Sequence, residues 1–595
     1  MKMHRSTTRA ATMRFLYLAT CIAVATASKH YNTGDTVDLY ANVVGPFANP
    51  SETYQYFTLP ICAPHPESKE KLLGLGEVLA GHRLVTGPYT IKFREPIESA
   101  TLCVRYIDEE DMETLRDAVI EDYYFQFVLD GDLPLWGFIG KMERIKPESK
   151  KRDAHRLVLF THLHFDIMYN EDRVIQVDVS TNPEAAIDIS KPSARSVEFT
   201  YSVSWQPTDI PFGRRKERYE KYSFLPQHVE LHWFSIANSC ATVAVLTGVL
   251  ASILLRVLKA DVRRYMDPEA AETSSDAGWK MLHGDVFRTP PAPGVFSACV
   301  GAGTQILVIT SAIFLLSLAG HYRAYNRGAL LASCVILYAF TAGIAGYTSG
   351  KLFRALGGEE WAGNCAFVML LFCGPLLVAF SVLNSIAWAY GSTAALPFGT
   401  IVIISLLWVV VTAPLTVAGA AMGRRGPNEL DVPCRTSKHV NGVPDLPWYR
   451  AAFPQMLAAG LLPFSAIYIE LHYIFASVWG HKVYTIYAVL FVIFCILLVV
   501  TAFVSIAFTY FQLAAEDHRW WWRSYICGGA TGMYIYAYAF YFFMSRSNMG
   551  GLLQTSFYFG YNFMMCYAVF LMLGAVGWTA AYWFVKYMYR QVKSE

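Results

Sequence analysis

Hydrophobic and polar positions divide this 595-residue chain into two parts that meet near Trp233. Before that point, short segments of β-branched and aromatic residues alternate with turn signals such as Asp130-Gly131-Asp132. Short strands at such intervals are typical of an all-β sandwich. Residues 28–232 are therefore predicted to form one sandwich-like domain, interrupted by a helix near residues 108–120. Its strands are predicted from the segments 36–40, 89–93, 124–129, 156–160, 174–179 and 197–205.

After Trp233 the apolar runs lengthen to the roughly 17–25 residues that a helix needs to cross a bilayer. Hydrocarbon offers no hydrogen bonds to the backbone, so these runs are predicted to be helices. The expected fold class is an α+β membrane protein, with a lumenal all-β domain followed by a nine-helix bundle over residues 233–585. The nine spans are predicted at about 234–258, 295–319, 328–347, 365–387, 397–419, 454–478, 484–511, 525–544 and 557–585.

The first residues have the pattern of a secretory signal peptide. Basic residues from Lys2 to Arg14 precede the apolar run 15–24, and Ala25-Thr26-Ala27 follows it. A basic start, a short apolar core and an A-x-A site predict a signal peptide over residues 1–27, cleaved after about Ala27. The alternative is a retained anchor, but the run is too short to span as a helix.

The positions of the charged residues predict how the protein is oriented in the membrane. The formal net charge is +2, which gives no indication of nucleic-acid binding. If the amino-terminal domain is lumenal, most basic loop residues face the cytosol, as the positive-inside rule requires. The short lumenal loops then hold only four basic residues. An odd number of spans places residues 586–595 in the cytosol as a tail. The four lumenal residues are Arg323, Arg327, Lys482 and Arg546.

Two pairs of side chains in the amino-terminal domain are candidates for a disulfide and a metal site. Cys62 and Cys103 are the cysteines before the first span other than Cys21, and an oxidising lumen permits a bond between them. The sequence leaves open whether they pair. His162 and His164 lie two residues apart on a predicted strand and share one face. No third ligand is evident nearby, so we predict no metal site and no cofactor.

The ordered series of local motifs resembles one family, the nonaspanins, also called the transmembrane nine superfamily or endomembrane protein 70 proteins. Each motif alone is weak, but their order from the mature amino terminus to the last residue is specific. One departure is His82, where an Asp or Asn would be expected. The motifs are Val44-Gly45-Pro46, Asn49-Pro50-Ser51-Glu52-Thr53-Tyr54, Leu59-Pro60, His232-Trp233-Phe234, Gly278-Trp279-Lys280, His283-Gly284-Asp285, Leu396-Pro397-Phe398-Gly399-Thr400, Leu462-Pro463-Phe464, Ile469-Glu470-Leu471, Glu516-Asp517-His518-Arg519-Trp520-Trp521-Trp522-Arg523-Ser524 and Phe559-Gly560-Tyr561.

The resemblance implies residence in Golgi and endosomal membranes. It also implies a role in the trafficking or surface delivery of other membrane proteins, some recognised through glycine-rich spans. The terminal residues Val592-Lys593-Ser594-Glu595 look like the family's Lys-x-Asp/Glu signal, whose reader would be the coatomer (COPI) coat. An exposed ammonium with two carboxylates suits such a charge-paired contact. The alternative is that Lys593 is one more positive-inside lysine.

Two features near the membrane add site candidates. Glu470 lies inside the sixth predicted span, where an ionisable residue is costly and by default functional. It could bind a client span or hold two helices together. The tryptophans Trp520, Trp521 and Trp522, with Arg519 and Arg523, follow the seventh span. We predict that they anchor the protein among the lipid headgroups; the alternative is an adaptor surface.

These observations predict a trafficking factor that is not an enzyme, because the sequence has no nucleophile elbow, phosphate-binding loop or metalloprotease motif. Its expected partners are client membrane proteins, the coatomer coat and membrane lipids, with no nucleic acid. The alternative is a secondary transporter or channel for a small solute or ion. Glu470 favours the alternative, whereas the absence of a repeated half-structure in the sequence counts against it.

Overall fold

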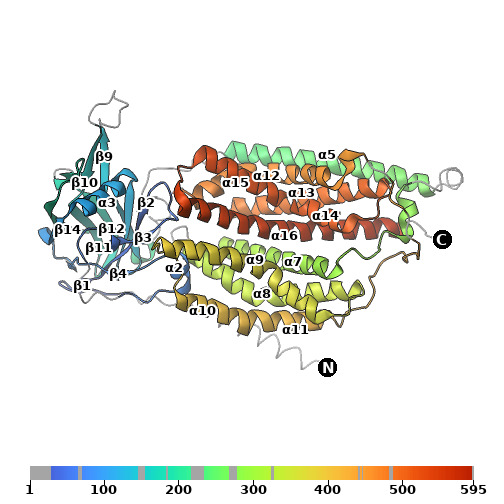
Figure 1. Ribbon diagram of the computed structural model, residues 1–595, viewed down its shortest axis with the longest axis horizontal. Helices are drawn as coiled ribbons and strands as arrows, with labels where there is room; N and C mark the ends of the chain where they lie inside the picture. Colours follow the sequence, from blue (N-terminus) through green and yellow to red (C-terminus); the bar gives the residue numbers. More distant parts are fainter. Residues whose placement is uncertain are drawn as a thin grey trace.

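The structure is a computed structural model of the chain, shown in Figure 1. It describes residues 29–63, 70–144, 155–182, 185–215, 233–266, 278–322, 327–439, 442–444, 447–480 and 487–591. A β-rich domain lies at one end and a bundle of long helices extends away from it, so the predicted fold class is confirmed.

The amino-terminal domain, called the β domain below, contains fourteen strands among the described residues. The predicted segments 124–129, 156–160, 174–179 and 197–205 each coincide with a strand, whereas the long strands at Ile97–Ile107 and His162–Asn170 lie outside the predicted segments. The strands are β1 (Thr36–Val37), β2 (Leu39–Pro46), β3 (Tyr54–Gln55), β4 (Val85–Thr86), β5 (Ile91–Lys92), β6 (Ile97–Ile107), β7 (Tyr123–Leu129), β8 (Leu133–Phe138), β9 (Gly140–Arg144), β10 (His155–Leu159), β11 (His162–Asn170), β12 (Arg173–Thr181), β13 (Ile187–Asp188) and β14 (Arg195–Pro207).

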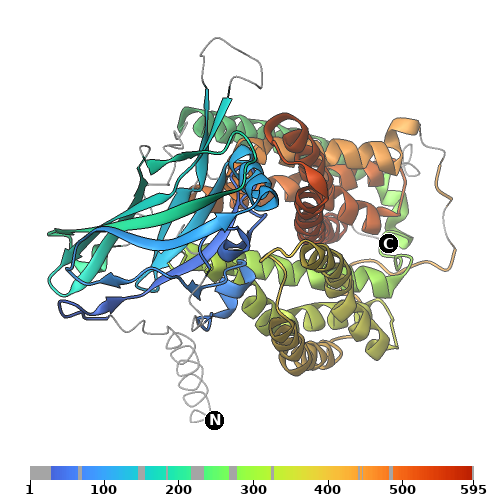
Figure 2. The same cartoon turned by 60° about the vertical axis from the view of Figure 1, so that its left-hand side comes forward.

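Two larger sheets of the β domain pack across one apolar core. One has the strand order β3-β2-β7-β8, with β4 paired to β2, and the other has the order β12-β11-β14-β6. Strands β11 and β14 run parallel, and Phe165 of β11 points into the core while His164 lies on the opposite face. The ring of Tyr89 joins the two sheets, with its centroid 5.7 Å from that of Phe127 and 5.5 Å from that of Phe165. Figure 2 shows the strands of this domain from a second side.

The predicted helix of the β domain is present as α3 (Glu109–Ile120). Its first turn is capped by Asp108, whose carboxylate accepts a hydrogen bond from the Asp111 amide at 2.8 Å. Such a cap satisfies an amide that has no partner within the helix. Met112, Leu115 and Val119 recur at helical spacing, and all three are buried in the core. The short elements α2 (Leu75–Leu79), η1 (Tyr56–Thr58) and η4 (Phe212–Arg214) complete the domain.

In the described part of the chain, eight helical segments are long and apolar enough to cross a membrane. They coincide with eight of the nine predicted spans. The helices that form these eight segments are α5 (Trp233–Met266), α7 (Pro293–Leu318), α8 (Arg327–Ala355), α9 (Trp361–Ala389), the continuous α10 (Phe398–Leu407), η6 (Trp408–Thr412) and α11 (Ala413–Gly423), α12 (Ala452–Val478), α13 (Tyr487–Ala514) and α16 (Gly551–Gln591). Short 3-10 turns, η5 (Trp279–Gly284) and η7 (Trp448–Arg450), lie between them.

The remaining predicted span, at residues 525–544, is divided in the structure. Helix α14 (Trp520–Gly529) and helix α15 (Thr531–Arg546) meet at Ala530. Ala530 keeps right-handed helical angles, with φ −57° and ψ −23°, so the chain continues from one helix into the next. Figure 1 shows α15 closer to the β domain and α14 further away. Neither helix alone has the length of a span, but together they cover the predicted residues.

Pro414 explains an irregular turn within another span. The helix widens into a π-helical turn over η6, directly before Pro414 near the start of α11. Proline lacks the amide that would continue the hydrogen-bond ladder, and its ring crowds the carbonyl four residues earlier. A single π turn relieves this conflict without ending the helix.

The bundle is built from two groups of helices, which Figure 1 shows as its lower and upper parts. We call α7 to α11 the first group and α5 with α12 to α16 the second group; α16 contacts α7 and α9 and so joins them. In the first group, backbones touch through glycine. A Cβ atom on Gly346 would lie 2.1 Å from the Thr416 carbonyl oxygen, and one on Gly419 would lie 2.0 Å from that of Gly343. Only glycine allows this approach.

The β domain contacts one end of the bundle, at a surface we call the junction. Its centre is the carbonyl of Thr53, which accepts hydrogen bonds from the Thr393 amide at 2.9 Å and the Ser392 hydroxyl at 2.8 Å. Gly76 of α2 and Gly328 of α8 touch backbone to backbone, because a Cβ on Gly76 would lie 2.4 Å from the Gly328 carbonyl. The loop between α9 and α10 therefore supports the domain directly. The opposite end of the bundle is called the distal end.

Candidate functional site

The tryptophans of α14 lie at the distal end, but two of them do not face the membrane surface. Trp520 and Trp521 are 0% and 3% exposed. The Trp520 indole donates to the Val286 carbonyl at 2.7 Å, and its ring stacks on Trp521 at 4.8 Å between centroids. The prediction of an interfacial anchor is wrong for these two residues, because a headgroup anchor must reach lipid. Trp520 joins α14 to the segment before α7 instead, and Trp521 packs against Phe296 of α7 and Trp578 of α16.

Trp522 is partly buried, and its indole donates to the Pro291 carbonyl at 2.8 Å. The two arginines predicted with the tryptophans, Arg519 and Arg523, contact a carboxylate rather than the membrane surface, and they differ in exposure. Both contact Asp517, which is fully buried: Arg519 Nε at 3.2 Å and Arg523 Nη1 at 3.2 Å. Arg523 is largely buried, whereas Arg519 is mostly exposed. A buried carboxylate needs such paired charges, so these residues stabilise the turn between α13 and α14.

The end of α16 is fixed at the same distal end. The Tyr589 hydroxyl donates to the Trp279 carbonyl at 2.5 Å, and the Lys586 ammonium contacts Asp431 at 2.6 Å. The hydrogen bond and the charge of Lys586 lower the pKa of the Asp431 carboxyl, although Asp431 itself is 80% exposed. Helix α16 continues to Gln591. Residues 586–591 of the predicted tail thus belong to this helix, and the boundary of the tail at residue 586 stays a prediction.

Three predicted site residues lie outside the part of the chain that the structure describes. They are Lys593 and Glu595 of the predicted sorting signal and Ala27 of the predicted cleavage site. These assignments stay predictions from the sequence.

Glu470 lies inside α12 and is only 2% exposed. Its neighbour His472 turns toward α15, where its Nδ1 atom lies 3.1 Å from the Tyr538 hydroxyl. The two residues thus have separate surroundings, as expected from their helical positions. A client span would pass along the outer surface of the bundle, so the burial of Glu470 favours a role within the bundle.

His162 and His164 belong to a ladder of hydroxyl and imidazole groups on the outer face of β11 and β14. His162 contacts Thr200 and Ser202 at 2.8 Å each, and His164 contacts Ser202 at 2.6 Å. Burial and the neighbouring His164 lower the pKa of His162. Among the described residues, no group of three metal-ligating side chains has the geometry of a metal site. The histidines are best explained by this hydrogen-bonded ladder.

Cys62 and Cys103 form a disulfide, with their Cα atoms 5.9 Å apart. It ties the loop after η1 to strand β6, next to the Arg105 guanidinium that donates to the Ile61 carbonyl at 2.6 Å. The sequence left this pairing open, and 41 residues separate the two cysteines. Folding of β6 beside that loop brings them together.

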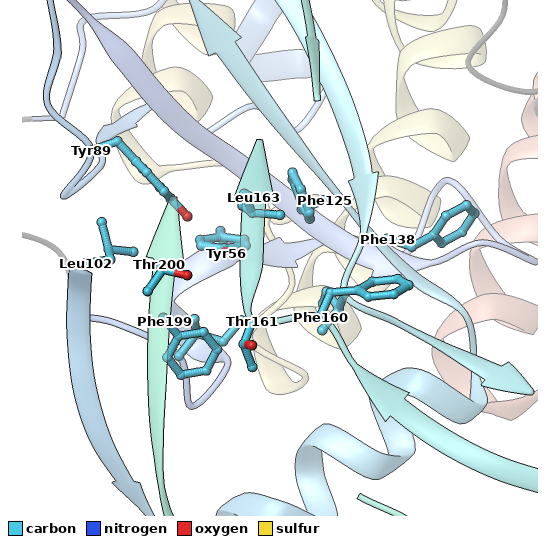
Figure 3. Close-up of a pocket in the computed structure, with 12 residues that line it drawn as sticks. Tyr56, Tyr89, Leu102, Phe125, Phe138, Phe160, Thr161, Leu163, Phe199 and Thr200 are labelled. Carbon is cyan, nitrogen blue, oxygen red and sulfur yellow. The ribbon is translucent and has the colours of Figure 1, made fainter. Parts of the chain in front are cut away.

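A small cavity lies between the two sheets of the β domain (Figure 3). Aromatic rings such as Tyr56, Phe125 and Phe199 line it, with Thr161 and Thr200 as polar lining residues. Its volume is about 20 Å³, which holds one water molecule but no organic ligand. We therefore assign it no binding role.

The sequence reasoning missed the contacts that organise both ends of the bundle. Thr53 and Thr393 at the junction, and Trp279 and Asp431 at the distal end, pair with residues more than 150 positions away. No local pattern could identify these partners. The available signal was indirect, because Thr53 and Trp279 both lie in the motifs that carry the family resemblance.

Comparisons with known proteins agree with that resemblance. The sequence model of the family Endomembrane protein 70 matches residues 53–552. Transmembrane 9 superfamily member 2 of Arabidopsis thaliana is 53% identical over 96% of both chains, and member 4 of the same plant is 50% identical over 98% of both. Transmembrane 9 superfamily member 1 of Bos taurus is 42% identical over 95% of this chain and 94% of its own. The chain therefore belongs to the endomembrane protein 70 family, the transmembrane 9 superfamily.

Proposed function

We propose that the chain is a Golgi and endosomal trafficking factor, without enzymatic activity, that helps to localise or sort other membrane proteins. The observation that carries this proposal is the terminal sequence Val592-Lys593-Ser594-Glu595 on a member of this family. In this proposal the β domain lies in the lumen and the distal end in the cytosol, as the distribution of basic loop residues predicts.

The helix that precedes the proposed sorting signal is held in place at the distal end. Helix α16 ends at Gln591, two positions before Lys593, and its last turns are held by Tyr589 and Lys586. A coat subunit would read the ammonium of Lys593 together with the carboxylates of Glu595, through charge-assisted contacts. We propose that this coat is the coatomer and that its binding returns the protein to the Golgi.

Clients would meet the outer surfaces of the protein, because the closest glycine contacts are occupied inside the bundle. Gly346 packs on α11, and Gly577 packs on Gly528 of α14. Large apolar side chains such as Leu377 and Val378 of α9 remain exposed on the outside. A glycine-rich client span would supply the small residues that let two helices approach closely.

The proposal is tested by replacing Lys593 and Glu595 with Ala in the tagged full-length protein. We expect the protein to leave the Golgi for the cell surface or degradative compartments, and to lose co-purification with coatomer. The matched control is Arg590→Ala, which removes a nearby exposed charge and leaves the last four residues intact. Unchanged Golgi residence of the double variant would contradict the retrieval role.

Glu470 favours one second candidate function, a secondary transporter or channel, because a buried carboxylate in a span often lies on an ion path. For this candidate, the purified protein in liposomes should show a solute or ion flux that Glu470→Gln abolishes. A flux that the substitution leaves unchanged would remove Glu470 from such a mechanism.

A further inference from the structure

Many serine and threonine hydroxyls in the bundle donate a hydrogen bond to a backbone carbonyl of their own helix. Thr304 of α7, Thr341 of α8 and Thr579 of α16 each donate to the carbonyl four residues earlier, at 2.7 Å. This bond is the usual solution for serine and threonine in an apolar surrounding. Hydroxyls that do not make it need another partner.

Several buried hydroxyls in the described part of the bundle are exceptions, and two of them, those of Thr501 and Ser505, lie on helix α13. Thr501, Ser505, Thr509 and Gln512 follow one another at spacings of four, four and three residues, so they share one face, which we call the polar stripe. Each is at most 2% exposed, although α13 has the highest mean hydropathy of the candidate spans, 3.2. Among the described residues, the Thr501 and Ser505 hydroxyls and the Gln512 amide nitrogen have no hydrogen-bond partner.

Polar groups in the same situation come from the helices around α13. The Thr531 hydroxyl at the start of α15 and the Gln455 carbonyl oxygen on α12 are buried, and neither has a partner in the described part of the chain. Ser505 lies against α16, because a Cβ on Gly577 would approach its hydroxyl to 2.4 Å. Gly577 in turn touches Gly528 of α14. Ser505 therefore sits where α13, α14 and α16 meet.

These groups form steps along the bundle axis. Helices α12 and α13 run in opposite directions, and Val478 and Tyr487 mark their ends nearest the β domain. At a rise of 1.5 Å per residue, Gln512 lies about 37 Å from that end, Ser505 about 27 Å, Thr501 about 21 Å and Glu470 about 12 Å. From one residue to the next, the height along the axis therefore changes by about 6–10 Å. These groups lead from the distal end into the bundle and end at Glu470.

We propose that the polar stripe of α13 lines a path of internal water between the distal end and Glu470. Leaving several buried polar groups unpaired in a membrane bundle is costly, and the side chains that the structure describes do not supply their partners. Water is small enough to do so, and a buried water typically bonds two to four polar groups. Such a path lets Glu470 exchange protons with the solution at the distal end. The inference does not depend on the proposed trafficking role.

The experiment uses the silver ion, which is close to water in size and binds thiols. Ser505→Cys is compared with Val504→Cys, a neighbouring and similarly buried position whose side chain is turned by about 100° around the helix from that of Ser505. Each full-length variant is exposed to Ag⁺ in chloride-free buffer, and the thiols left unreacted are then alkylated after denaturation and counted by mass spectrometry. We expect the thiol at position 505 to react about tenfold faster or more, because only hydrated thiols ionise readily.

Equal rates at positions 504 and 505 would overturn the proposal. If Ser505→Cys does not fold, Thr501→Cys serves instead, with Val500→Cys as its control. A second experiment tests whether Ag⁺ enters the path from the distal end. Adding Gln512→Leu to the Ser505→Cys variant should slow the reaction several-fold, because Gln512 lies nearest the distal end. An unchanged rate would show that the path does not open there.

Discussion

The two groups of helices differ in how their central buried polar side chains find partners. In the first group, Asn364 of α9 connects three helices: its amide nitrogen donates to the Ser349 hydroxyl at 3.0 Å, and its oxygen accepts from the Ser297 hydroxyl at 3.1 Å. In the second group, Thr501 and Ser505 are equally buried but have no such partner among the described residues. Composition alone does not distinguish the groups, since both consist of strongly apolar helices.

The difference follows the way in which the backbones are spaced. Helices α8 and α11 touch at Gly346 and Gly419, which leaves no room for anything between them. In the second group, large rings separate α12 from α15, such as Phe475 against Tyr538 at 5.4 Å between centroids, although α14 and α16 touch at Gly528 and Gly577. The distance between helix axes depends on the side chains at the contact. Close backbone contact therefore leaves no space between α8 and α11, whereas rings hold α12 and α15 further apart.

The largest expected effect comes from breaking the glycine contact of the first group. Gly419→Ala would place a methyl group 2.0 Å from the Gly343 carbonyl oxygen, so the backbones must separate. We expect a loss of about 3 kcal/mol in the free energy of unfolding, as for other overpacked interiors. Thermal or denaturant unfolding of the purified protein measures it.

The matched control is Gly363→Ala on α9, where a Cβ would meet no atom within 4 Å. This substitution should leave stability unchanged or raise it slightly, because alanine favours a helix more than glycine does. Equal destabilisation by both substitutions would mean that close backbone contact does not distinguish the first group.

The parts of the fold that could be predicted from the sequence depend on neighbouring residues. Alternation along β11 and helical spacing in α3 repeat within a few positions, and the spans follow from apolar length. The division of α14 from α15 could not be predicted in this way. The surroundings of α14 depend on contacts distant in sequence, such as that of the Trp520 indole with the Val286 carbonyl, 234 residues earlier.

The candidate site shows the same limit. Three tryptophans beside two arginines fit the composition of a membrane anchor, but composition does not reveal that Asp517 is buried and holds Arg523. The polar stripe of α13 has a readable spacing in the sequence. Its meaning requires the structure, because Thr509 donates to the Ser505 carbonyl whereas Ser505 and Thr501 make no such bond. The sorting signal at Lys593 and Glu595 stays a prediction.

A smaller loss of stability is expected when a polar partner is removed from the first group. Asn364→Leu would leave the Ser349 hydroxyl, which is fully buried, without the only partner that the described residues give it. We expect a loss of about 1–3 kcal/mol in the free energy of unfolding, the usual cost of orphaning a buried group. Adding Ser349→Ala to this variant should recover part of the loss, because the orphaned hydroxyl is then removed as well.

The matched change in the second group is Thr501→Val, which keeps the side-chain shape and removes one hydroxyl. No protein partner among the described residues loses a hydrogen bond, so we expect unfolding at nearly the same midpoint as the native chain. The reason is that water bonded to Thr501 can be released or can rebind to Thr531 and Ser505. If the hydroxyl were buried in a dry surrounding, its removal would instead stabilise the protein by about 1–3 kcal/mol. A raised midpoint for Thr501→Val would therefore argue against water in the second group, and a loss as large as that of Asn364→Leu would erase the difference between the groups.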